Sequence, residues 1–206
     1  MLDKNGFNLW SKEYDKTVKE SSKQYPFDGY YDVLNYVYNL VINKKSGNIL
    51  DMGFGTGVLT NKLYDNGANI YGVDFSESMI DIAYKKMPKG TFIQWDFNHG
   101  IPIELENKRF DYIISSYAIH HLDNNKKVEF ICKLKELLNK EGKIIIADVE
   151  FKKEVDLLKC RNININIWHN DETYMVAEKI EPLLYNKGIN LKYTQISSCA
   201  GVLELD

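Results

Sequence analysis

Residues 51–57 read Asp51-Met52-Gly53-Phe54-Gly55-Thr56-Gly57, with three glycines at alternate positions behind a carboxylate. The stretch follows a short apolar run, residues 48–50, and precedes an amphipathic segment that begins at Val58. Glycines allow a tight turn and let a ligand approach the backbone closely. The N–H groups at the start of the following helix point back toward such a loop. A strand, a glycine loop and a helix in this order predict a ligand-binding turn.

Outward from this loop, strand-like and helix-like segments alternate along most of the chain. Continuous apolar strands alternating with amphipathic helices are typical of an α/β fold whose mostly parallel sheet is covered on both faces. Ser76 is expected to cap the second helix, and the last two strands are expected to form a hairpin. The expected strands are 48–51, 69–74, 91–94, 110–115, 143–149, 189–196 and 201–205, and the expected helices are 58–66, 77–86, 126–139 and 173–186, with Gly67, Gly142 and Gly188 as helix stops.

The region before this pattern, residues 1–46, is rich in tyrosine and mostly helix-like, and no linker separates it from the first strand. We therefore expect a single domain over residues 1–206, with a helical cap at 1–46 and an α/β core at 47–206. In open α/β sheets the ligand sits at the carboxyl ends of the strands. This rule points to residues 51–57, 74–79, 94–98, 115–122 and 148–151.

The composition excludes several classes of protein. The 206 residues carry 26 basic and 29 acidic side chains, a net charge of −3, which argues against a nucleic-acid partner. Only Arg109 and Arg161 are arginines, so few bidentate groups are available for phosphate. The cysteines, Cys132, Cys160 and Cys199, are too far apart to suggest a disulfide framework or a zinc site. No signal core or membrane-spanning run is evident, so a soluble cytoplasmic protein is expected.

The spacing of the glycines distinguishes two kinds of nucleotide ligand. The dinucleotide pattern G-x-G-x-x-G/A begins correctly at Gly53 and Gly55, but Val58 occupies its last position. Asp51 would repel a pyrophosphate and attract an ammonium or sulfonium group. Asp74, at the end of the second strand, can accept hydrogen bonds from the ribose hydroxyls of NAD or of S-adenosylmethionine. Asp51 and Val58 therefore favour S-adenosylmethionine.

Five motifs keep their order and spacing between Asn48 and Val149. They read Ile49-Leu50-Asp51-Met52-Gly53-Phe54-Gly55-Thr56-Gly57, Tyr71-Gly72-Val73-Asp74-Phe75-Ser76, Gln94-Trp95-Asp96-Phe97, Phe110-Asp111-Tyr112-Ile113-Ile114-Ser115-Ser116 and Gly142-Lys143-Ile144-Ile145-Ile146-Ala147-Asp148. Together they resemble the motifs of the class I S-adenosylmethionine-dependent methyltransferases. Trp10-Ser11-Lys12-Glu13-Tyr14-Asp15 and the segment Tyr117 to Leu122 are similar to a small bacterial branch of that family. The resemblance implies a Rossmann-like, doubly wound sheet of seven mostly parallel strands, the last one antiparallel.

The same resemblance implies roles for the matching residues. Gly53, Gly55 and Gly57 would pack against the methionine and ribose portions of the cofactor. Asp51 would sit near the methionine amino group, and Asp74 would hold the ribose hydroxyls. Phe75 and Met79 would flank the adenine, and Asp96 would accept from its amino group with the Phe97 backbone nearby. Ser115 and Ser116 would lie beside the methionine portion.

Methyl transfer from a sulfonium is an in-line displacement in which positioning supplies much of the rate. A base is needed only if the acceptor is protonated. Tyr117, His120 and His121 are the candidates, because they follow the fourth strand and share one face if residues 118–122 form a helical turn. Some related O-methyltransferases bind a metal through acids at these positions. Tyr117 and His120 stand there in this chain, so no metal is expected.

Aromatic residues of the cap are candidates for a lid over the acceptor. Trp10, Tyr14, Tyr25 and Tyr30 could place a ring against the sulfonium, or could simply pack on the sheet. Residues 152–171 have poor periodicity and are expected to border the acceptor pocket, with Trp168 and His169 as the most site-like side chains.

The function that these patterns favour is S-adenosylmethionine-dependent methylation of a small-molecule acceptor. A nicotinamide-dependent oxidoreductase and a non-catalytic S-adenosylmethionine-binding protein are the alternatives. The sequence specifies neither the acceptor, nor the atom that is methylated, nor the oligomeric state.

Overall fold

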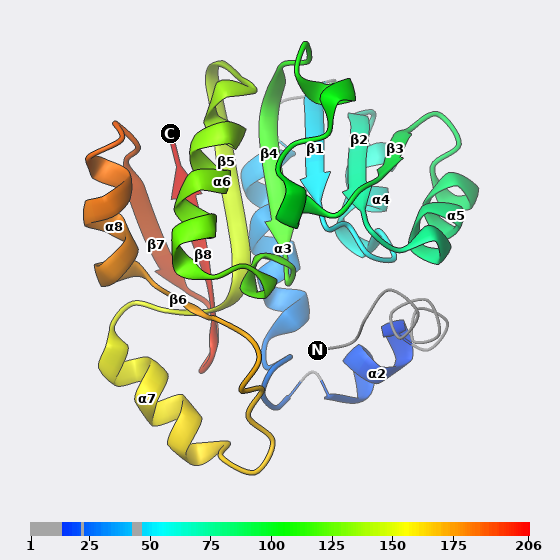
Figure 1. The fold of residues 1–206 in the computed structure, drawn as a ribbon. Helices are drawn as coiled ribbons and strands as arrows, with labels where there is room; N and C mark the ends of the chain where they lie inside the picture. Colours follow the sequence, from blue (N-terminus) through cyan, green and yellow to red (C-terminus); the bar gives the residue numbers. More distant parts are fainter. Residues whose placement is uncertain (1–13, 22, 43–46) are drawn as a thin grey trace.

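The computed structural model describes residues 14–21, 23–42 and 47–206, and places a twisted sheet between two layers of helices (Figure 1). The strands are β1 (Asn48–Met52), β2 (Asn69–Asp74), β3 (Thr91–Gln94), β4 (Phe110–Ser116), β5 (Leu138–Phe151), β6 (Met175–Val176), β7 (Leu191–Gln195) and β8 (Ala200–Leu205). The α-helices are α2 (Tyr14–Ser21), α3 (Tyr30–Val41), α4 (Val58–Asp65), α5 (Glu77–Lys86), α6 (Asn124–Glu136), α7 (Glu154–Ile163) and α8 (Ala177–Tyr185). The described residues also form three short 3₁₀ helices: η1 (Phe97–His99) and η2 (Ile103–Leu105) between β3 and β4, and η3 (Ile119–His121) after β4.

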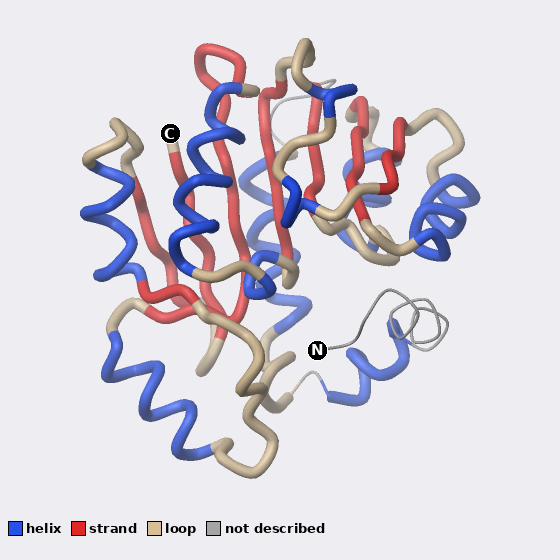
Figure 2. The backbone as a smooth tube through the Cα atoms, viewed as in Figure 1, coloured by secondary structure: helices blue, strands red, loops and turns tan. Residues whose placement is uncertain are grey.

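The order of strands across the sheet is β3-β2-β1-β4-β5-β8-β7, and the short β6 pairs with the end of β5. Strands β1 to β5 are parallel to one another, whereas β8 is antiparallel to both β5 and β7. Figure 2 shows these strands side by side with helices on either side. The expected Rossmann-like fold, including its antiparallel last strand and closing hairpin, is confirmed.

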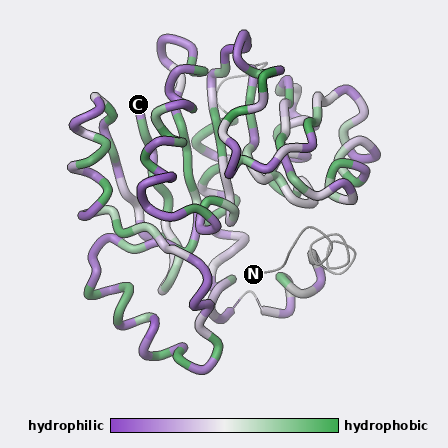
Figure 3. Tube along the Cα trace, viewed as in Figure 1, coloured by the Kyte–Doolittle hydropathy of each residue, from purple (hydrophilic) through white to green (hydrophobic). Residues whose placement is uncertain are grey.

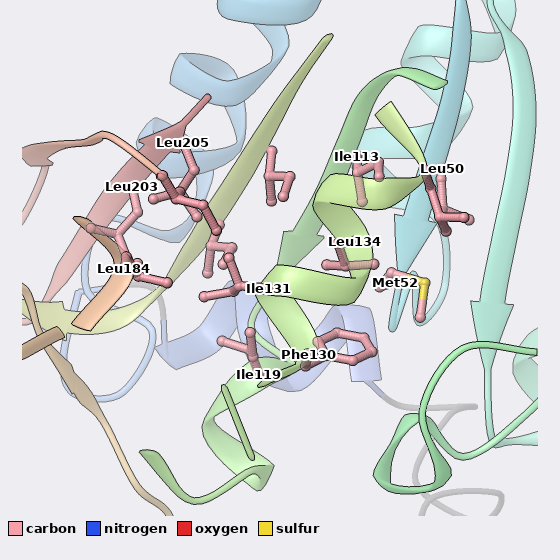
Figure 4. Close-up of a cluster of buried hydrophobic side chains, with 14 of the residues drawn as sticks. Leu50, Met52, Ile113, Ile119, Phe130, Ile131, Leu134, Leu184, Leu203 and Leu205 are labelled. Atoms are coloured by element: carbon pink, nitrogen blue, oxygen red, sulfur yellow. The ribbon is translucent and has the colours of Figure 1, made fainter. Parts of the chain in front are cut away.

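Both faces of the sheet are apolar. Successive residues of a strand point to opposite faces, and neighbouring residues of the central strands are both apolar. Ile113 of β4 packs in the cluster with α6 and α8, and the next residue, Ile114, packs in the cluster with α3, α4 and α5. Phe130, Ile131 and Leu134 of α6 lie against the strands in Figure 4. Figure 3 shows the same distribution, with hydrophobic residues concentrated in the central strands. The sheet is thereby held rigidly, and its carboxyl edge can position a site.

The local signals around the first two helices behave as expected. The Oγ of Ser76 caps α5 by accepting from the backbone N–H of Met79 at 3.4 Å. Gly67 ends α4 in the left-handed conformation, with a φ of 90°. The predicted bounds of β2, α5 and β3 agree with the structure.

Helix α6 ends earlier than its apolar pattern predicts. Leu138 continues the spacing of a helical face, but it pairs with Phe110 and opens β5. Gly142 consequently lies inside a strand rather than at a helix stop. The predicted helix 173–186 likewise begins at Ala177, because Met175 and Val176 pair with β5. In both places tertiary strand pairing outweighs local pattern.

Helix α7 is the element that the sequence pattern does not predict. Of its residues only Cys160 is buried, while Val155 and Leu158 are exposed, so it has no continuous apolar face. The apolar residues of this segment therefore do not recur with the 3.6-residue period of an amphipathic helix. The helix lies below the carboxyl ends of the strands in Figure 1, on the side of the sheet where α2 also lies.

Among the helices of the described ranges, none is both long and apolar enough to cross a membrane.

Candidate functional site

A cavity of about 510 Å³ opens at the carboxyl ends of β1, β2 and β4. Its walls come from the glycine loop, the end of β2, the segment after β4, the cap and the segment before β6. It is lined by Pro26, Phe27, Tyr30, Leu34, Asp51, Gly53, Phe54, Gly55, Thr56, Val58, Leu59, Asp74, Phe75, Met79, Phe97, Ser116, Tyr117, Ala118, His120, His121, Val149, His169, Asp171 and Glu172. The volume is suited to a ligand of small-molecule size.

The glycine loop forms one wall of the cavity, and its backbone at Gly53 packs closely against Ala118. Gly53 has a φ of 78°, and a Cβ built on it would lie 2.4 Å from the Cβ of Ala118. Gly55, with a φ of 56°, would place a Cβ with no heavy atom within 4 Å. The first glycine therefore permits packing between the loop and η3, and the second leaves space beside the cavity.

Asp51 lies at the base of this loop and is 1% exposed. Its Oδ2 accepts a hydrogen bond from the hydroxyl of Thr60, whereas its Oδ1 is buried and has no hydrogen-bond partner among the described residues. Burial raises the pKa of Asp51 to about 7, although the Thr60 hydroxyl favours the charged form. A buried carboxylate oxygen without a partner is costly, and a cationic ligand group would satisfy it.

Asp74 joins the end of β2 to the glycine loop. Its Oδ2 accepts from the backbone N–H of Gly55 at 2.9 Å, and its Oδ1 accepts from the N–H of Ser76 at 2.9 Å. Burial raises the pKa of Asp74 to about 6, against the effect of these N–H donors. The backbone N–H of Phe75 is a third donor to Asp74. A carboxylate has about four acceptor positions, so three backbone donors still leave capacity for a ligand.

Two histidines of η3 face the cavity from the opposite wall. The ring centroids of His120 and His121 are 4.3 Å apart. The Nδ1 of His120 lies 2.7 Å from the Oδ1 of Asp148, and the backbone N–H of His120 donates to the Oδ2 of Asp148 at 3.2 Å. Asp148 is buried in β5 and its Oδ1 also accepts from the N–H of Val149 at 2.7 Å. The ring of His120 is therefore fixed by a strand that follows it by 28 residues.

These two rings differ in their acid–base properties. Burial alone would lower the pKa of His120, but Asp148 and then Glu172 outweigh it and raise this pKa above its ordinary value. Burial, followed by the charge of His120, lowers the pKa of His121 to about 4. His121 is therefore neutral at physiological pH, and His120 is the ring that can take up a proton there.

Glu172 reaches the same wall from the segment between α7 and β6. Its Oε2 lies 3.9 Å from the Nε2 of His120 and accepts from the hydroxyl of Tyr174 at 2.6 Å. Its Oε1 lies 2.9 Å from the Nδ1 of His169. The carboxylate is thus held on both sides beside the cavity.

Aromatic rings complete the wall on the side of the cap. Tyr117 adopts a φ of 51°, a left-handed conformation that is rare for a bulky residue, and its ring lies 4.9 Å from that of Tyr30. The hydroxyl of Tyr117 is buried without a hydrogen-bond partner among the described residues, and burial raises its pKa well above the ordinary value. Tyr25 stacks on Trp168 at 4.8 Å, and its hydroxyl bonds to that of Tyr174 and accepts from the N–H of His169.

Most residues that the sequence singles out line the cavity. These are Tyr30, Asp51, Gly53, Gly55, Asp74, Phe75, Met79, Phe97, Ser116, Tyr117, His120, His121 and His169. Five others lie nearby without lining it. Gly57 is the N-terminal cap residue of α4, and Tyr25 and Trp168 stack behind the wall. Ser115 donates to the backbone carbonyl of Met52, and Asp96 caps η1.

Trp10 and the side chain of Tyr14 lie outside the described residues. Within the described part of the chain, no group of three or more His, Cys, Asp or Glu side chains is arranged to hold a metal ion.

Sequence reasoning gave no role to Phe27, Asp171 or Glu172, which line the cavity, or to Asp148, which does not line it but holds the ring of His120. Asp148 lies within residues 148–151, to which the rule for open α/β sheets points, but no sequence signal connects its carboxylate with His120. Asp171 ends the stretch 152–171 that is expected to border the acceptor pocket, and Glu172 lies just beyond it. Neither has a local signal for its own role, because contacts far along the chain place this segment.

Comparison with known proteins gives consistent results. Residues 49–142 match the family described as a methyltransferase domain. An uncharacterized methyltransferase of Bacillus mycoides strain KBAB4 is 36% identical over 210 residues, covering 96% of this chain and 94% of that protein. A structure of DhpI in complex with SAH is similar with a TM-score of 0.73 and 14% identity, over 98% of this chain and 94% of that one. Magnesium protoporphyrin IX methyltransferase from Synechocystis PCC 6803 with bound SAH has a TM-score of 0.72 and 18% identity, over 98% and 99%.

Proposed function

Because the chain belongs to the class I S-adenosylmethionine-dependent methyltransferases, we propose that it transfers the methyl group of S-adenosylmethionine to a small-molecule acceptor by in-line displacement. S-adenosylmethionine is the cofactor of this family, and it is consumed as the methyl donor.

The observation that carries the proposal is the buried, unpartnered Oδ1 of Asp51 beside an open glycine loop. The donor carries an ammonium and a sulfonium, and either charge is attracted to a buried carboxylate. Asp74 retains acceptor capacity for ribose hydroxyls at the end of the neighbouring strand. The lining residues therefore fit this donor on their own chemistry.

The remaining residue roles follow from the family motifs and from the lining of the cavity. Gly53, Gly55 and Gly57 form the loop beside the methionine and ribose portions, Phe75 and Met79 flank the adenine, and Asp96 with Phe97 borders the adenine edge. Ser115 and Ser116 lie on the methionine side. Asp96 caps η1 and does not line the cavity, so its proposed contact with the adenine rests on the family motif alone.

A small molecule is the acceptor class that the described walls favour. Neither lysine nor arginine is found among the described residues that line the cavity, so a polyanionic nucleic acid lacks the cations that it needs there. The Synechocystis neighbour is named for magnesium protoporphyrin IX, itself a small molecule. The cap side chains Tyr25 and Tyr30, together with Trp10 and Tyr14, are proposed to border the acceptor.

We treat residues 1–206 as one methyltransferase domain with a cap at 1–46 and a core at 47–206. The match to the Bacillus mycoides relative along 96% of the chain supports treating it as one unit.

Calorimetric titration tests the proposal. S-adenosylmethionine and its demethylated product should both bind, and NADH should not. The Asp51→Asn variant should bind the two S-adenosyl ligands roughly 10- to 100-fold more weakly, because it removes a charge-assisted contact of about 1.5–3 kcal/mol. Asp81→Asn, on the exposed face of α5, is the matched control and should bind as the wild type does.

Each alternative has its own outcome in this experiment. Binding of NADH with no response to S-adenosylmethionine would indicate an oxidoreductase. Tight binding without transfer of labelled methyl groups to a panel of cell metabolites would indicate a protein that binds the donor without catalysis.

A further inference from the structure

We propose that His120 is the proton acceptor of the methyl-transfer step, set in that role by Asp148 and Glu172, and that the methyl acceptor is a hydroxyl or thiol that reacts as its anion. The inference rests on the proposed function, because it specifies the chemistry of the acceptor in the same cavity.

The first step of the argument concerns which nitrogen of His120 is available. Nδ1 lies 2.7 Å from Oδ1 of Asp148. Burial alone would raise the pKa of Asp148, but the charge and hydrogen bond of His120 outweigh it, so the carboxyl is ionised and can only accept. The neutral ring must therefore carry its proton on Nδ1. The lone pair of Nε2 is then directed to the other side of the ring, toward Glu172, which lines the cavity together with His120.

The second step concerns what surrounds Nε2. The Oε2 of Glu172 is 3.9 Å away, too far for a hydrogen bond but close enough to stabilise an imidazolium. The hydroxyl of Tyr174 and the ring of His169 hold Glu172 in this position. A small acceptor group can therefore reach Nε2 without displacing a strong bond between His120 and Glu172.

The third step is the full charge environment of His120. Asp148 on β5 and Glu172 before β6 both favour the protonated ring, whereas Lys127 on α6 opposes it. Lys127 is buried, and its ammonium donates to the backbone carbonyl of Thr173. The rings of His121 and Tyr174 are the other titratable groups against His120, at centroid distances of 4.3 and 6.2 Å. Two carboxylates against one ammonium leave a net attraction for a proton at Nε2.

The bookkeeping of the step follows from this geometry. The O–H or S–H bond of the acceptor breaks and its proton passes to Nε2 of His120. The electron pair left on oxygen or sulfur forms the new bond to the methyl carbon, while the bond from that carbon to the donor sulfur breaks and its electron pair stays on the sulfur. One positive charge is thus lost at the donor sulfur and one is gained at His120, between Asp148 and Glu172. An acceptor that is already an anion, such as a carboxylate, or that has no proton, such as a tertiary amine, would make no use of this arrangement.

This arrangement predicts that the bound donor changes the pKa of His120. A sulfonium in the cavity repels an imidazolium, so the pKa of His120 should be lower with S-adenosylmethionine bound than with the demethylated product bound. The ring would then be neutral before transfer and protonated after it, in the order that the step requires.

Nuclear magnetic resonance of the full chain with ¹⁵N-labelled histidine tests the inference without a known acceptor. The chain has four histidines, and single His→Gln variants assign their signals. The tautomer and the titration of each ring are measured with S-adenosylmethionine and with its demethylated product. Calorimetry on the same samples verifies that both ligands bind, and thermal melting verifies that each variant is folded.

The expected result is a neutral His120 with its proton on Nδ1, and a lower pKa in the donor complex than in the product complex. Glu172→Gln should lower the pKa of His120 in both complexes and leave the tautomer unchanged. Asp148→Asn should lower it too and move the proton to Nε2. Glu178→Gln, an exposed carboxylate at the start of α8, and the exposed ring of His99 are controls that should show no change.

Three results would overturn the inference. One is a His120 that titrates at the same pH in both complexes although calorimetry shows both ligands bound. Another is a neutral ring protonated on Nε2 in the wild type. The third is that neither S-adenosyl ligand binds, which calorimetry reports separately and which would remove the proposed function as well.

Discussion

The glycine-loop wall of the cavity, residues 51–79, comes from one continuous β1-α4-β2-α5 stretch, whereas the opposite wall joins segments that lie far apart in the chain. On the first wall, Asp74 bonds to the N–H of Gly55 only 19 residues away. On the second, Tyr25 meets His169 across 144 residues. Local turn geometry therefore determines the glycine-loop wall, which is proposed to hold the donor and is called the donor wall. Assembly of the whole sheet determines the opposite wall, which is proposed to border the acceptor and is called the acceptor wall. Four substitutions test this difference between the walls, and each has its own expected effect.

The largest effect is expected on the acceptor wall at His120. His120→Gln should lower turnover about 100- to 10,000-fold, the range for loss of a general base, while donor binding stays close to that of the wild type. Turnover of the wild type should rise with pH through the pKa of His120, because only the neutral ring accepts a proton. Asp148→Asn removes the carboxylate that raises this pKa and should move the rise to lower pH.

A labelled-methyl assay over pH, with an acceptor identified from the metabolite panel, measures both effects. His99→Gln is the control. A wild-type pH profile in His120→Gln would exclude this ring from the mechanism.

The next effect concerns the contact that joins the two walls. Gly53→Ala places a Cβ 2.4 Å from that of Ala118 at a φ of 78°, so overpacking adds to left-handed strain. We expect a loss of about 3 kcal/mol in the free energy of unfolding. Gly67→Ala has the same strain with no heavy atom within 4 Å, and should cost about 1–2 kcal/mol. Urea unfolding measures both, and equal losses would mean that the loop and η3 are not closely packed.

A smaller effect is expected at the donor wall. Asp74→Ala should weaken binding of the S-adenosyl ligands by about 1–3 kcal/mol, because the ribose hydroxyls and the N–H of Gly55 lose a charged acceptor. Calorimetry measures the change, with Asp81→Asn as the surface control. Unchanged affinity would place the ribose elsewhere.

The smallest effect is expected behind the acceptor wall. Tyr25→Phe keeps the stack on Trp168 but removes the hydroxyl that accepts from the N–H of His169 and bonds to Tyr174. Stability should fall by about 1 kcal/mol, and donor affinity should not change. Tyr185→Phe, which alters an exposed side chain on α8, should leave the melting temperature unaltered. A loss of donor affinity in Tyr25→Phe would show that the two walls are coupled.

The contrast between the walls also explains what the sequence could predict. The bounds of β2, α5 and β3, the cap at Ser76 and the lining position of Asp74 all follow from signals within a few residues. Each depends on a turn, a cap or a strand end that a short stretch of chain determines by itself.

The parts that could not be predicted depend on distant contacts. Leu138 has a helical spacing and nevertheless pairs with β4. Helix α7 could not be recognised as a helix from the sequence, because most of its apolar residues are exposed and give no buried face. Glu172 lies at the site because of its contacts with Tyr174, His169 and His120. No local sequence pattern predicts these contacts.

The position of β8 in the sheet has a consequence for how the protein is made. Strand β8 lies between β5 and β7, although it is synthesised after both. While the chain emerges from the ribosome, the backbone N–H and C=O groups on one edge of β5 therefore lack their partner strand, and β7 lacks the strand that joins it to the sheet. An open edge of this kind is a site for association with other chains. This edge stays open until residues 200–205 emerge and pair with both strands.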